Sequence, residues 1–130
     1  MKTLLVVAVF FVFAVPVQAQ ELPPPLATSP AIKPLSVEWI KGRISYYADL
    51  YGVSEITMNK IVACESNYSI NATHITSKEH SVGLVQINLM AHNIDEYDAR
   101  APNFALDFLA RKLSEGKGRM WVCYQQLGTS

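Results

Sequence analysis

Residues 54–66 read SEITMNKIVACES, and residues 81–88 read SVGLVQIN. The first stretch begins with a serine that can cap a helix, and its apolar residues recur at the helical steps of three and four. The second stretch is short and apolar, with some strand character. Polar, turn-prone residues 67–81 separate the two. This order predicts a helix that ends near Ser66, then a loop, and then a small β excursion.

A second helix is predicted before this stretch. Ser36 is suited to cap it, and Gly52 is suited to end it. The apolar stripe of this amphipathic helix follows steps of three and four and comprises Val37, Ile40, Ile44, Tyr47 and Tyr51. We therefore expect the folded domain to begin at Ser36 and to occupy residues 36–130.

A third helix is predicted after the β excursion. Residues 89–102 are a mixed connection that ends at a proline. The apolar residues of the range 104–113 then favour a helix, which the glycines at 116 or 118 would terminate. A last short element begins at Trp121. Together these elements predict a mainly α domain of the α+β type, with one short β excursion.

The N-terminus has the pattern of a cleaved signal peptide. One lysine precedes the uninterrupted apolar run of residues 4–15, and Pro16 and the small residue Ala19 follow. The alternative is a retained membrane anchor, but a span needs about 20 apolar residues. We expect residues 1–19 to be removed and the protein to be exported, to the periplasm or outside the cell. No second apolar stretch of that length follows, so no integral span is expected after cleavage.

The region after the signal segment is expected to be a linker. Residues 20–35 hold five of the seven prolines and few charges, which is typical of an extended spacer. If the signal segment were kept, this linker would tether the domain to a membrane.

Charge and cysteine content limit the possible partners and compartments. Eleven basic residues balance eleven acidic ones, so the charge gives no reason to expect a nucleic-acid partner. We expect a monomer. Cys64 and Cys123 are the two cysteines, and in an exported chain a disulfide between them is favoured over two free thiols. Closing a loop of about 60 residues would stabilise the domain by roughly 4 kcal/mol.

Two motifs resemble those of the lysozyme superfamily. The segment 64–66 (Cys-Glu-Ser) ends a predicted helix, and eighteen residues after its glutamate begins the segment 83–88, Gly-Leu-Val-Gln-Ile-Asn. This combination resembles the SLT-type lytic transglycosylases, which cleave bacterial peptidoglycan. The family pattern is Glu-Ser, a polar loop, and Gly-Leu-Met-Gln, often followed by Ile-Asn, so only Val85 departs from it. Pro102-Asn103 and the helix after them resemble a downstream part of the same family. The resemblance covers roughly residues 42–125 and implies a lysozyme-like fold.

The resemblance implies that Glu65 is the catalytic residue. Cleavage of a glycosidic bond needs a proton for the leaving oxygen, and hence a carboxyl group that stays protonated near neutral pH. Partial burial at a helix end raises the pKa of a glutamate in this way. The alternative interpretation is a solvated carboxylate at the end of a helix.

A second catalytic carboxylate is not predicted. Hydrolysing glycosidases normally use one, and the animal-type lysozymes, which the chain also resembles, carry an Asp two residues before the motif glycine. Ser81 has that place here. The other acidic residues of this region lie at positions that do not match: Glu79, Asp95, Glu96 and Asp98. The absence favours a lytic transglycosylase, in which Glu65 acts first as acid and then as base while the substrate forms a 1,6-anhydro ring. A hydrolytic lysozyme and a non-catalytic glycan-binding module are the alternatives.

The same resemblance proposes five substrate-binding residues. Gln86 is expected to contact the sugar or to orient the catalytic region, and Asn88 to present a second amide. The alternative is that both amides satisfy backbone groups in a turn. Gly83 permits a close backbone approach, and Ser66 belongs to the Glu-Ser pair. Tyr124 loosely matches a tyrosine that lines the cleft in the family.

Three histidines raise the question of a metal site. Their spacing fits no usual zinc pattern, and they lie scattered through predicted loops: His74, His80 and His92. We therefore predict surface histidines, with no metal and no cofactor.

Overall fold

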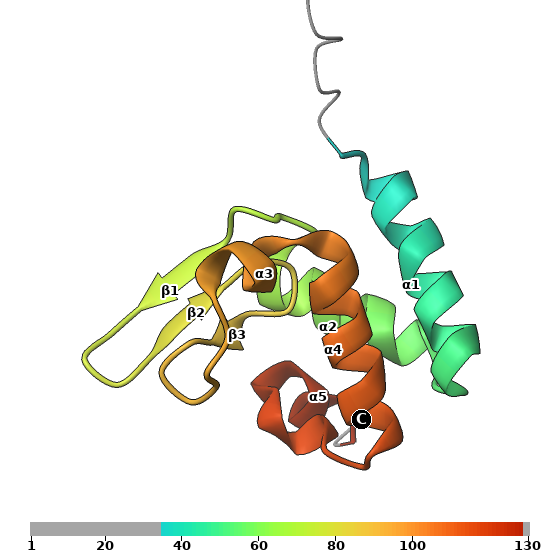
Figure 1. Cartoon of the computed structure of the whole chain (residues 1–130). Helices are drawn as coiled ribbons and strands as arrows, with labels where there is room; N and C mark the ends of the chain where they lie inside the picture. Colours follow the sequence, from blue (N-terminus) through green and yellow to red (C-terminus); the bar gives the residue numbers. More distant parts are fainter. Residues whose placement is uncertain (1–34, 129–130) are drawn as a thin grey trace, which may run out of the picture. The chain divides into compact units, whose positions relative to one another are not determined.

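The computed structural model describes residues 35–128. The predicted signal peptide, and the predicted linker apart from Leu35, lie outside the described residues. The described part is mainly helical, with one small antiparallel sheet (Figure 1). Its elements are α1 (Val37–Tyr51), α2 (Glu55–Ser66), β1 (Thr73–Ile75), β2 (His80–Val82), β3 (Ile87–Asn88), α3 (Glu96–Arg100), α4 (Pro102–Ser114), the 3₁₀ helix η1 (Gly118–Met120) and α5 (Val122–Leu127). This confirms the predicted mainly α class with a β excursion after the second helix.

Helix α1 begins and ends where the sequence predicts. The Ser36 hydroxyl accepts a hydrogen bond from the Trp39 amide at 3.1 Å, and Gly52 ends the helix in the left-handed conformation, with φ of 64°. The predicted stripe is buried at its centre, where Ala48 joins it. Val37 is 38% exposed, because the buried face of the helix begins only at Ile40, one turn later.

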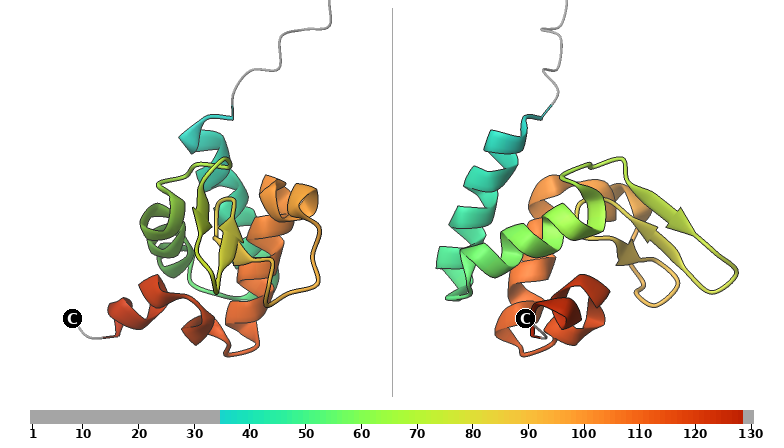
Figure 2. Two further views of the ribbon diagram at one scale, coloured as in Figure 1. Left: turned by 90° about the vertical axis from the view of Figure 1, so that its left-hand side faces the viewer. Right: turned by 180° about the vertical axis from the view of Figure 1, so that it is seen from behind.

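Helix α2 carries the first motif toward the sheet. The Ser54 hydroxyl caps its start, and Asn67 ends it with φ of 50°. Seen from behind in Figure 2, α2 runs from the end of α1 to the sheet, so its last residues lie beside the β-strands. Met58, Ile61 and Val62 are fully buried and fix the rotation of the helix about its axis.

The β excursion is larger than predicted. The strands are ordered β1-β2-β3, with Thr73 opposite Val82 and Val82 opposite Ile87. The apolar run 82–88 is therefore not one strand, because a turn at residues 83–86 divides it between β2 and β3. Strand β1 falls in the predicted polar loop, and α3 falls in the predicted connection. Both escape prediction because they are short and largely exposed.

Gly83 is a steric requirement of this turn. It has φ of 76°, and a Cβ atom added there would lie 2.6 Å from the carbonyl oxygen of Ala99, at the end of α3. Only glycine lets the turn approach α3 so closely. The close approach predicted for Gly83 is present, and it is made to the backbone of α3.

The predicted disulfide is present. Cys64 and Cys123 are joined, with their Cα atoms 6.0 Å apart and a sequence separation of 59. The bond connects the end of α2 to the start of α5. In the range 35–128, no helix is both long and apolar enough to cross a membrane.

Replacing Gly83 should destabilise the fold. We expect Gly83→Ala to lower the free energy of unfolding by about 2–4 kcal/mol, from the positive φ and the contact with the Ala99 oxygen. Gly42→Ala is the matched control, because Gly42 lies in α1 with nothing within 4 Å of an added Cβ. It should raise stability by about 0.5–1 kcal/mol. Urea unfolding measures both, and a Gly83→Ala protein as stable as the parent would contradict this account.

Removing the disulfide should also weaken the domain. Cys64→Ala/Cys123→Ala is expected to lower the free energy of unfolding by about 2–4 kcal/mol, chiefly because the unfolded chain gains conformational freedom. Denaturant unfolding of the parent with and without a reductant should show the same difference. The reductant should leave the double variant unchanged, and a reductant effect there would point to another cause.

Candidate functional site

The residues of both motifs meet at one hollow of about 330 Å³. It lies where the end of α2, the β2–β3 turn, α4 and the start of α5 approach one another. Its lining contains two carboxylates, two side-chain amides and an aromatic wall. These are Glu65 and Glu79, Gln86 and Asn88, and His92, Phe108 and Trp121.

The carboxyl group of Glu65 is held at the N-terminal end of α5. It is the penultimate residue of α2 and is half-buried. Its Oε1 accepts a hydrogen bond from the backbone amide of Cys123 at 3.3 Å. Since Cys123 is disulfide-bonded to Cys64, the residue next to Glu65, the bond holds the carboxyl group and its donor together.

The surroundings of Glu65 favour its protonated form. Burial raises the pKa of its carboxyl group, because the charged form loses solvation, and the negative charge of Glu79 raises that pKa further. The hydrogen bond from Cys123 acts in the opposite direction. The pKa of Glu65 therefore lies above its ordinary value, which is the direction of shift that a general acid near neutral pH needs.

Glu79 adds a carboxylate that the sequence did not predict for the site. It lies just before β2 and is half-buried. The Ser81 hydroxyl donates a hydrogen bond to its Oε1 at 2.5 Å. The side chain of Ser81 thus holds a carboxylate from two residues earlier in the chain. Glu79 therefore brings a second carboxylate to the hollow from a position that the motif did not select, and the prediction of a single catalytic glutamate stays a prediction.

Gln86 and Asn88 line the hollow and also hold the backbone around them. The Gln86 Nε2 donates to the Gly83 carbonyl at 3.0 Å, and Gln86 itself has φ of 49°. The Asn88 Oδ1 accepts from the amide of Met90 at 3.0 Å and from that of His80 at 3.4 Å. The interpretation that both amides satisfy backbone groups in a turn is confirmed, while their contact with a sugar stays a prediction that their place in the lining of the hollow permits.

Ser66 and Gly83 lie behind the hollow and do not line it. The Ser66 hydroxyl is 2.8 Å from the Leu84 carbonyl oxygen and 3.1 Å from that of Val62. Gly83 is buried against α3. Their observed contacts support the turn that carries Gln86.

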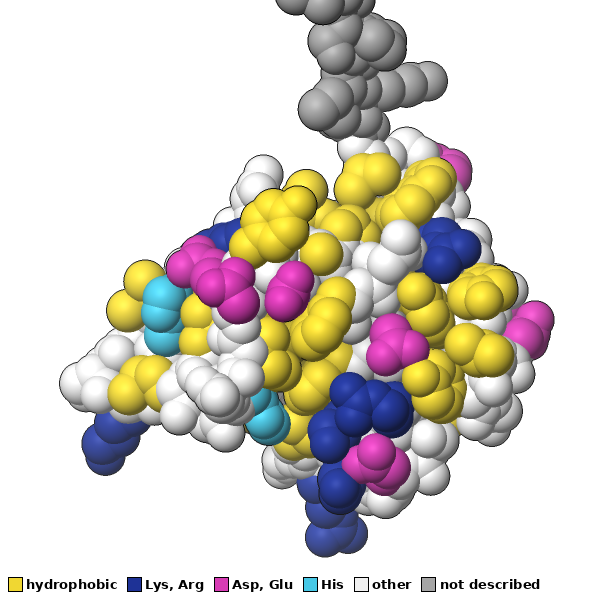
Figure 3. Space-filling view, viewed as in Figure 1, with side chains coloured by type: hydrophobic (Ala, Val, Ile, Leu, Met, Phe, Trp, Pro, Cys, Tyr) yellow, Lys and Arg dark blue, Asp and Glu magenta, His cyan; other side chains and the backbone are white. Residues whose placement is uncertain are grey.

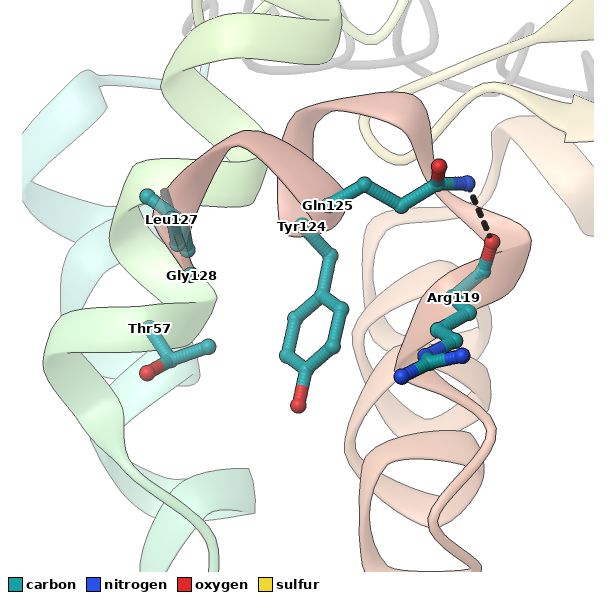
Figure 4. A pocket seen from close by; sticks show the side chains of 6 residues that line it. All are labelled: Thr57, Arg119, Tyr124, Gln125, Leu127 and Gly128. Atoms are coloured by element: carbon teal, nitrogen blue, oxygen red, sulfur yellow. Dashed lines mark hydrogen bonds between the residues drawn. The ribbon is translucent and has the colours of Figure 1, made fainter. Parts of the chain in front are cut away.

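Tyr124 is not brought together with Glu65. It lines a separate hollow of about 610 Å³ between the start of α2 and α5, together with Thr57, Arg119 and Gln125 (Figure 4). The Gln125 amide there donates to the Arg119 carbonyl at 2.8 Å. The Tyr124 ring lies where a side chain on Gly118 would otherwise sit, 2.6 Å from an added Cβ.

The aromatic wall is the part that sequence reasoning missed. Trp121 is 4% exposed, and its indole Nε1 donates to the Val85 carbonyl at 2.7 Å. Phe108 packs edge-to-face against it at 6.2 Å, and His92 packs against Phe108 at 5.4 Å. One signal in the sequence was available. Trp121 lies two positions before Cys123, so the predicted disulfide already placed it beside Glu65.

Two further surface features bear on binding. Basic side chains gather near the end of α4 (Figure 3), where Arg111, Lys112 and Lys117 surround Glu115. These cations are paired with a carboxylate and do not form a free basic patch. In the part of the chain that the structure describes, no group of three or more His, Cys, Asp or Glu side chains could hold a metal ion.

Comparison with known proteins finds no match to this chain, whether among protein-family models, curated proteins or solved structures. An assignment of function therefore depends on the two motifs and on the geometry of the hollow.

The raised pKa of Glu65 has a consequence for stability. Below the unfolded-state pKa the carboxyl group is protonated in both states, so its burial carries no ionisation penalty. As the pH rises through the folded-state pKa, the folded state increasingly bears the unfavourable ionised group. Glu65→Gln, which keeps the acceptor for the Cys123 amide, should therefore match the parent in stability near pH 4 and exceed it at neutral pH. Urea unfolding at several pH values measures the difference.

Glu115→Gln is the control with the opposite sign. Hydrogen bonds from Lys117 and Lys112 lower the pKa of Glu115. Its contribution to stability is therefore present above the unfolded-state pKa and is lost as the pH falls through the folded-state pKa. The variant should be less stable than the parent at neutral pH and should converge with it in acid. A Glu65→Gln protein that shows this same trend would contradict a raised pKa for Glu65.

Proposed function

We propose that this protein is an exported lytic transglycosylase, which cleaves the β-1,4 bond between MurNAc and GlcNAc in peptidoglycan with Glu65 as its acid and base. One observation carries the proposal: a half-buried carboxyl group with a raised pKa lines a hollow that also contains two amides and an aromatic wall. Peptidoglycan as the substrate is supported by the resemblance of residues 64–66 and 83–88 to the SLT-type enzymes.

The proposed reaction needs only one protonated carboxyl group. Glu65 donates its proton to the bridging oxygen as the bond from that oxygen to C1 of MurNAc breaks, which leaves positive charge on the sugar ring. The Glu65 carboxylate then takes the proton from the C6 hydroxyl of the same sugar, and the C6 oxygen bonds to C1. The product is a 1,6-anhydro-muramic end, and Glu65 is again protonated. The reaction consumes neither water nor a cofactor.

The lining of the hollow suits a sugar. Side-chain amides can exchange hydrogen bonds with hydroxyl groups, and an aromatic wall can pack against the apolar face of a pyranose ring. Gln86 and Asn88 supply the amides, and Trp121 and Phe108 the wall. Because each amide is also bonded to backbone, its orientation is set before the ligand arrives, which reduces the entropy lost on binding.

Export agrees with the chemistry of the domain. A disulfide persists in the oxidising environment outside the cytoplasm, and Cys64 and Cys123 form one. The predicted signal peptide would deliver the protein to the compartment that contains peptidoglycan. We propose that it acts there as a monomer.

Hydrolysis is the second candidate. Glu79 lines the same hollow as Glu65, and two carboxylates are what most hydrolysing glycosidases use. In that reaction water, and not the C6 hydroxyl, would supply the oxygen that bonds to C1. The product would then carry a reducing end.

Digestion of purified peptidoglycan tests the role of Glu65. We expect Glu65→Gln to lower the rate of cleavage by about 10²–10⁴-fold, because the amide cannot deliver a proton. The matched control is Glu38→Gln, which removes an exposed carboxylate from the first turn of α1 and should leave the rate unchanged. Unaltered cleavage by Glu65→Gln would exclude Glu65 as the acid.

Mass spectrometry of the digest separates the candidate functions. Anhydro-muramic ends identify a lytic transglycosylase, and reducing muramic ends identify a hydrolase. If the parent protein sediments with peptidoglycan and releases no fragments, the domain is a non-catalytic binding module.

A further inference from the structure

Glu79 has a defined position in the hollow, although no motif includes it. It is half-buried just before β2, and its side chain lines the same hollow as Glu65. The side chains of Ser81 and Glu79 lie next to each other, because the Ser81 hydroxyl donates a hydrogen bond to the Glu79 Oε1.

The neighbouring strand also contributes to this position. His74 on β1 is the cross-strand partner of Ser81, and its Nε2 lies 3.9 Å from the Glu79 Oε2. Each carboxylate oxygen of Glu79 thus has a polar neighbour on the hairpin. Ser81 is 1% exposed, so the donor that holds Glu79 is itself fixed by the interior of the domain.

We propose that Glu79 is the second carboxylate of this site and stabilises the positive charge that develops on the sugar ring, with Ser81 as its positioning residue. The inference rests on the proposed function, since it requires a glycosidic bond to be cleaved in this hollow. It differs from the prediction of a single catalytic glutamate. It also differs from the lysozyme arrangement, because the carboxylate belongs to residue 79 and not to the position of Ser81.

The chemistry assigns Glu79 an electrostatic part. When the bond from C1 to the bridging oxygen breaks, the proton comes from Glu65 and the electron pair stays with the leaving oxygen. The ring then carries positive charge, which a carboxylate held in place by the Ser81 hydroxyl stabilises without moving. Glu79 forms no bond and transfers no proton. Its effect is therefore the same whether C1 is next attacked by the C6 hydroxyl or by water.

The pKa of Glu65 depends on the charged and polar groups around it, and Glu79 is one of them. Two carboxylates and one histidine, His92, line the hollow, and no Lys or Arg is among its lining residues. His74 approaches Glu79 from β1, and the Cys123 amide donates to Glu65 from α5. The charge of Glu79 raises the pKa of Glu65. Removing that charge should therefore let Glu65 ionise at lower pH, and the enzyme should lose its acid earlier as the pH rises.

The pH dependence of peptidoglycan cleavage tests this inference. For Glu79→Gln we expect kcat/KM to fall by about 10- to 100-fold at the optimum. The alkaline limb of the profile should also move to lower pH, which a purely structural role would not cause. Glu79→Asp, which keeps the charge, should retain more activity than Glu79→Gln. Ser81→Ala should change both quantities in the same direction and by less, because Glu79 stays charged but is no longer held.

The outcomes separate this inference from the proposed function. If Glu65→Gln is inactive while Glu79→Gln has the same profile as Glu38→Gln, the role of Glu79 is excluded and the proposed function stands. If Glu65→Gln is fully active, the proposed function itself fails. Urea unfolding shows whether Glu79→Gln is folded. If Glu79→Gln does not fold, the pH profile of Ser81→Ala tests the inference instead. An alkaline limb of Ser81→Ala at the same pH as in the parent would overturn the inference.

Discussion

The disulfide between the end of α2 and the start of α5 is the constraint on which the site depends. Cys64 and Cys123 are bonded to each other, and each lies near a residue that lines the hollow. Glu65 follows Cys64 in the chain and accepts a hydrogen bond from the Cys123 amide, and Trp121 lies two positions before Cys123. A single disulfide therefore places the proposed acid, a donor to it and part of the aromatic wall within one small region. The same bond stabilises the fold, so stability and site geometry are linked here.

The turn at residues 83–86 is the second constraint, and hydrogen bonds from the end of α2 and from the residue before α5 hold it. The Ser66 hydroxyl, at the end of α2, contacts the carbonyl of Leu84, and the Trp121 indole contacts the carbonyl of Val85. On its other side the turn is in contact with the backbone of α3 at Gly83. Gln86 is thus oriented by backbone that is anchored on three sides. A sheet of three short strands can position a side chain in this way only because helices support it.

The protonation of Glu65 results from opposing effects of different size. Loss of solvation is the largest and favours the neutral carboxyl group, while the hydrogen bond from Cys123 favours the charged one. The charge of Glu79 adds to the first effect. The two carboxylates of the hollow, whose lining has no Lys or Arg, thus have different surroundings: Glu65 is half-buried, and Glu79 is held by a hydroxyl and approached by a histidine. Different environments for paired carboxylates are how one site obtains both an acid and a stabilising charge.

The sequence by itself determined the helices with strong caps and apolar periodicity, the pairing of the two cysteines, and the place of Glu65 and Gln86. These follow from local signals: Ser36 and Ser54 cap their helices through bonds to residues three positions on, and two cysteines allow a single pairing. Only the tertiary structure decided which other side chains share the hollow. Trp121 enters it and Tyr124 does not, although they are three residues apart, because one precedes α5 and the other lies within it. Glu79 lines the hollow from just before β2, where the Ser81 hydroxyl bonds it, and the strand β1 that pairs with β2 has only exposed residues. Because the residues of β1 are exposed, the sequence carries no apolar pattern that predicts this strand. The position of the residues beside it, including Glu79, is therefore known only from the tertiary structure.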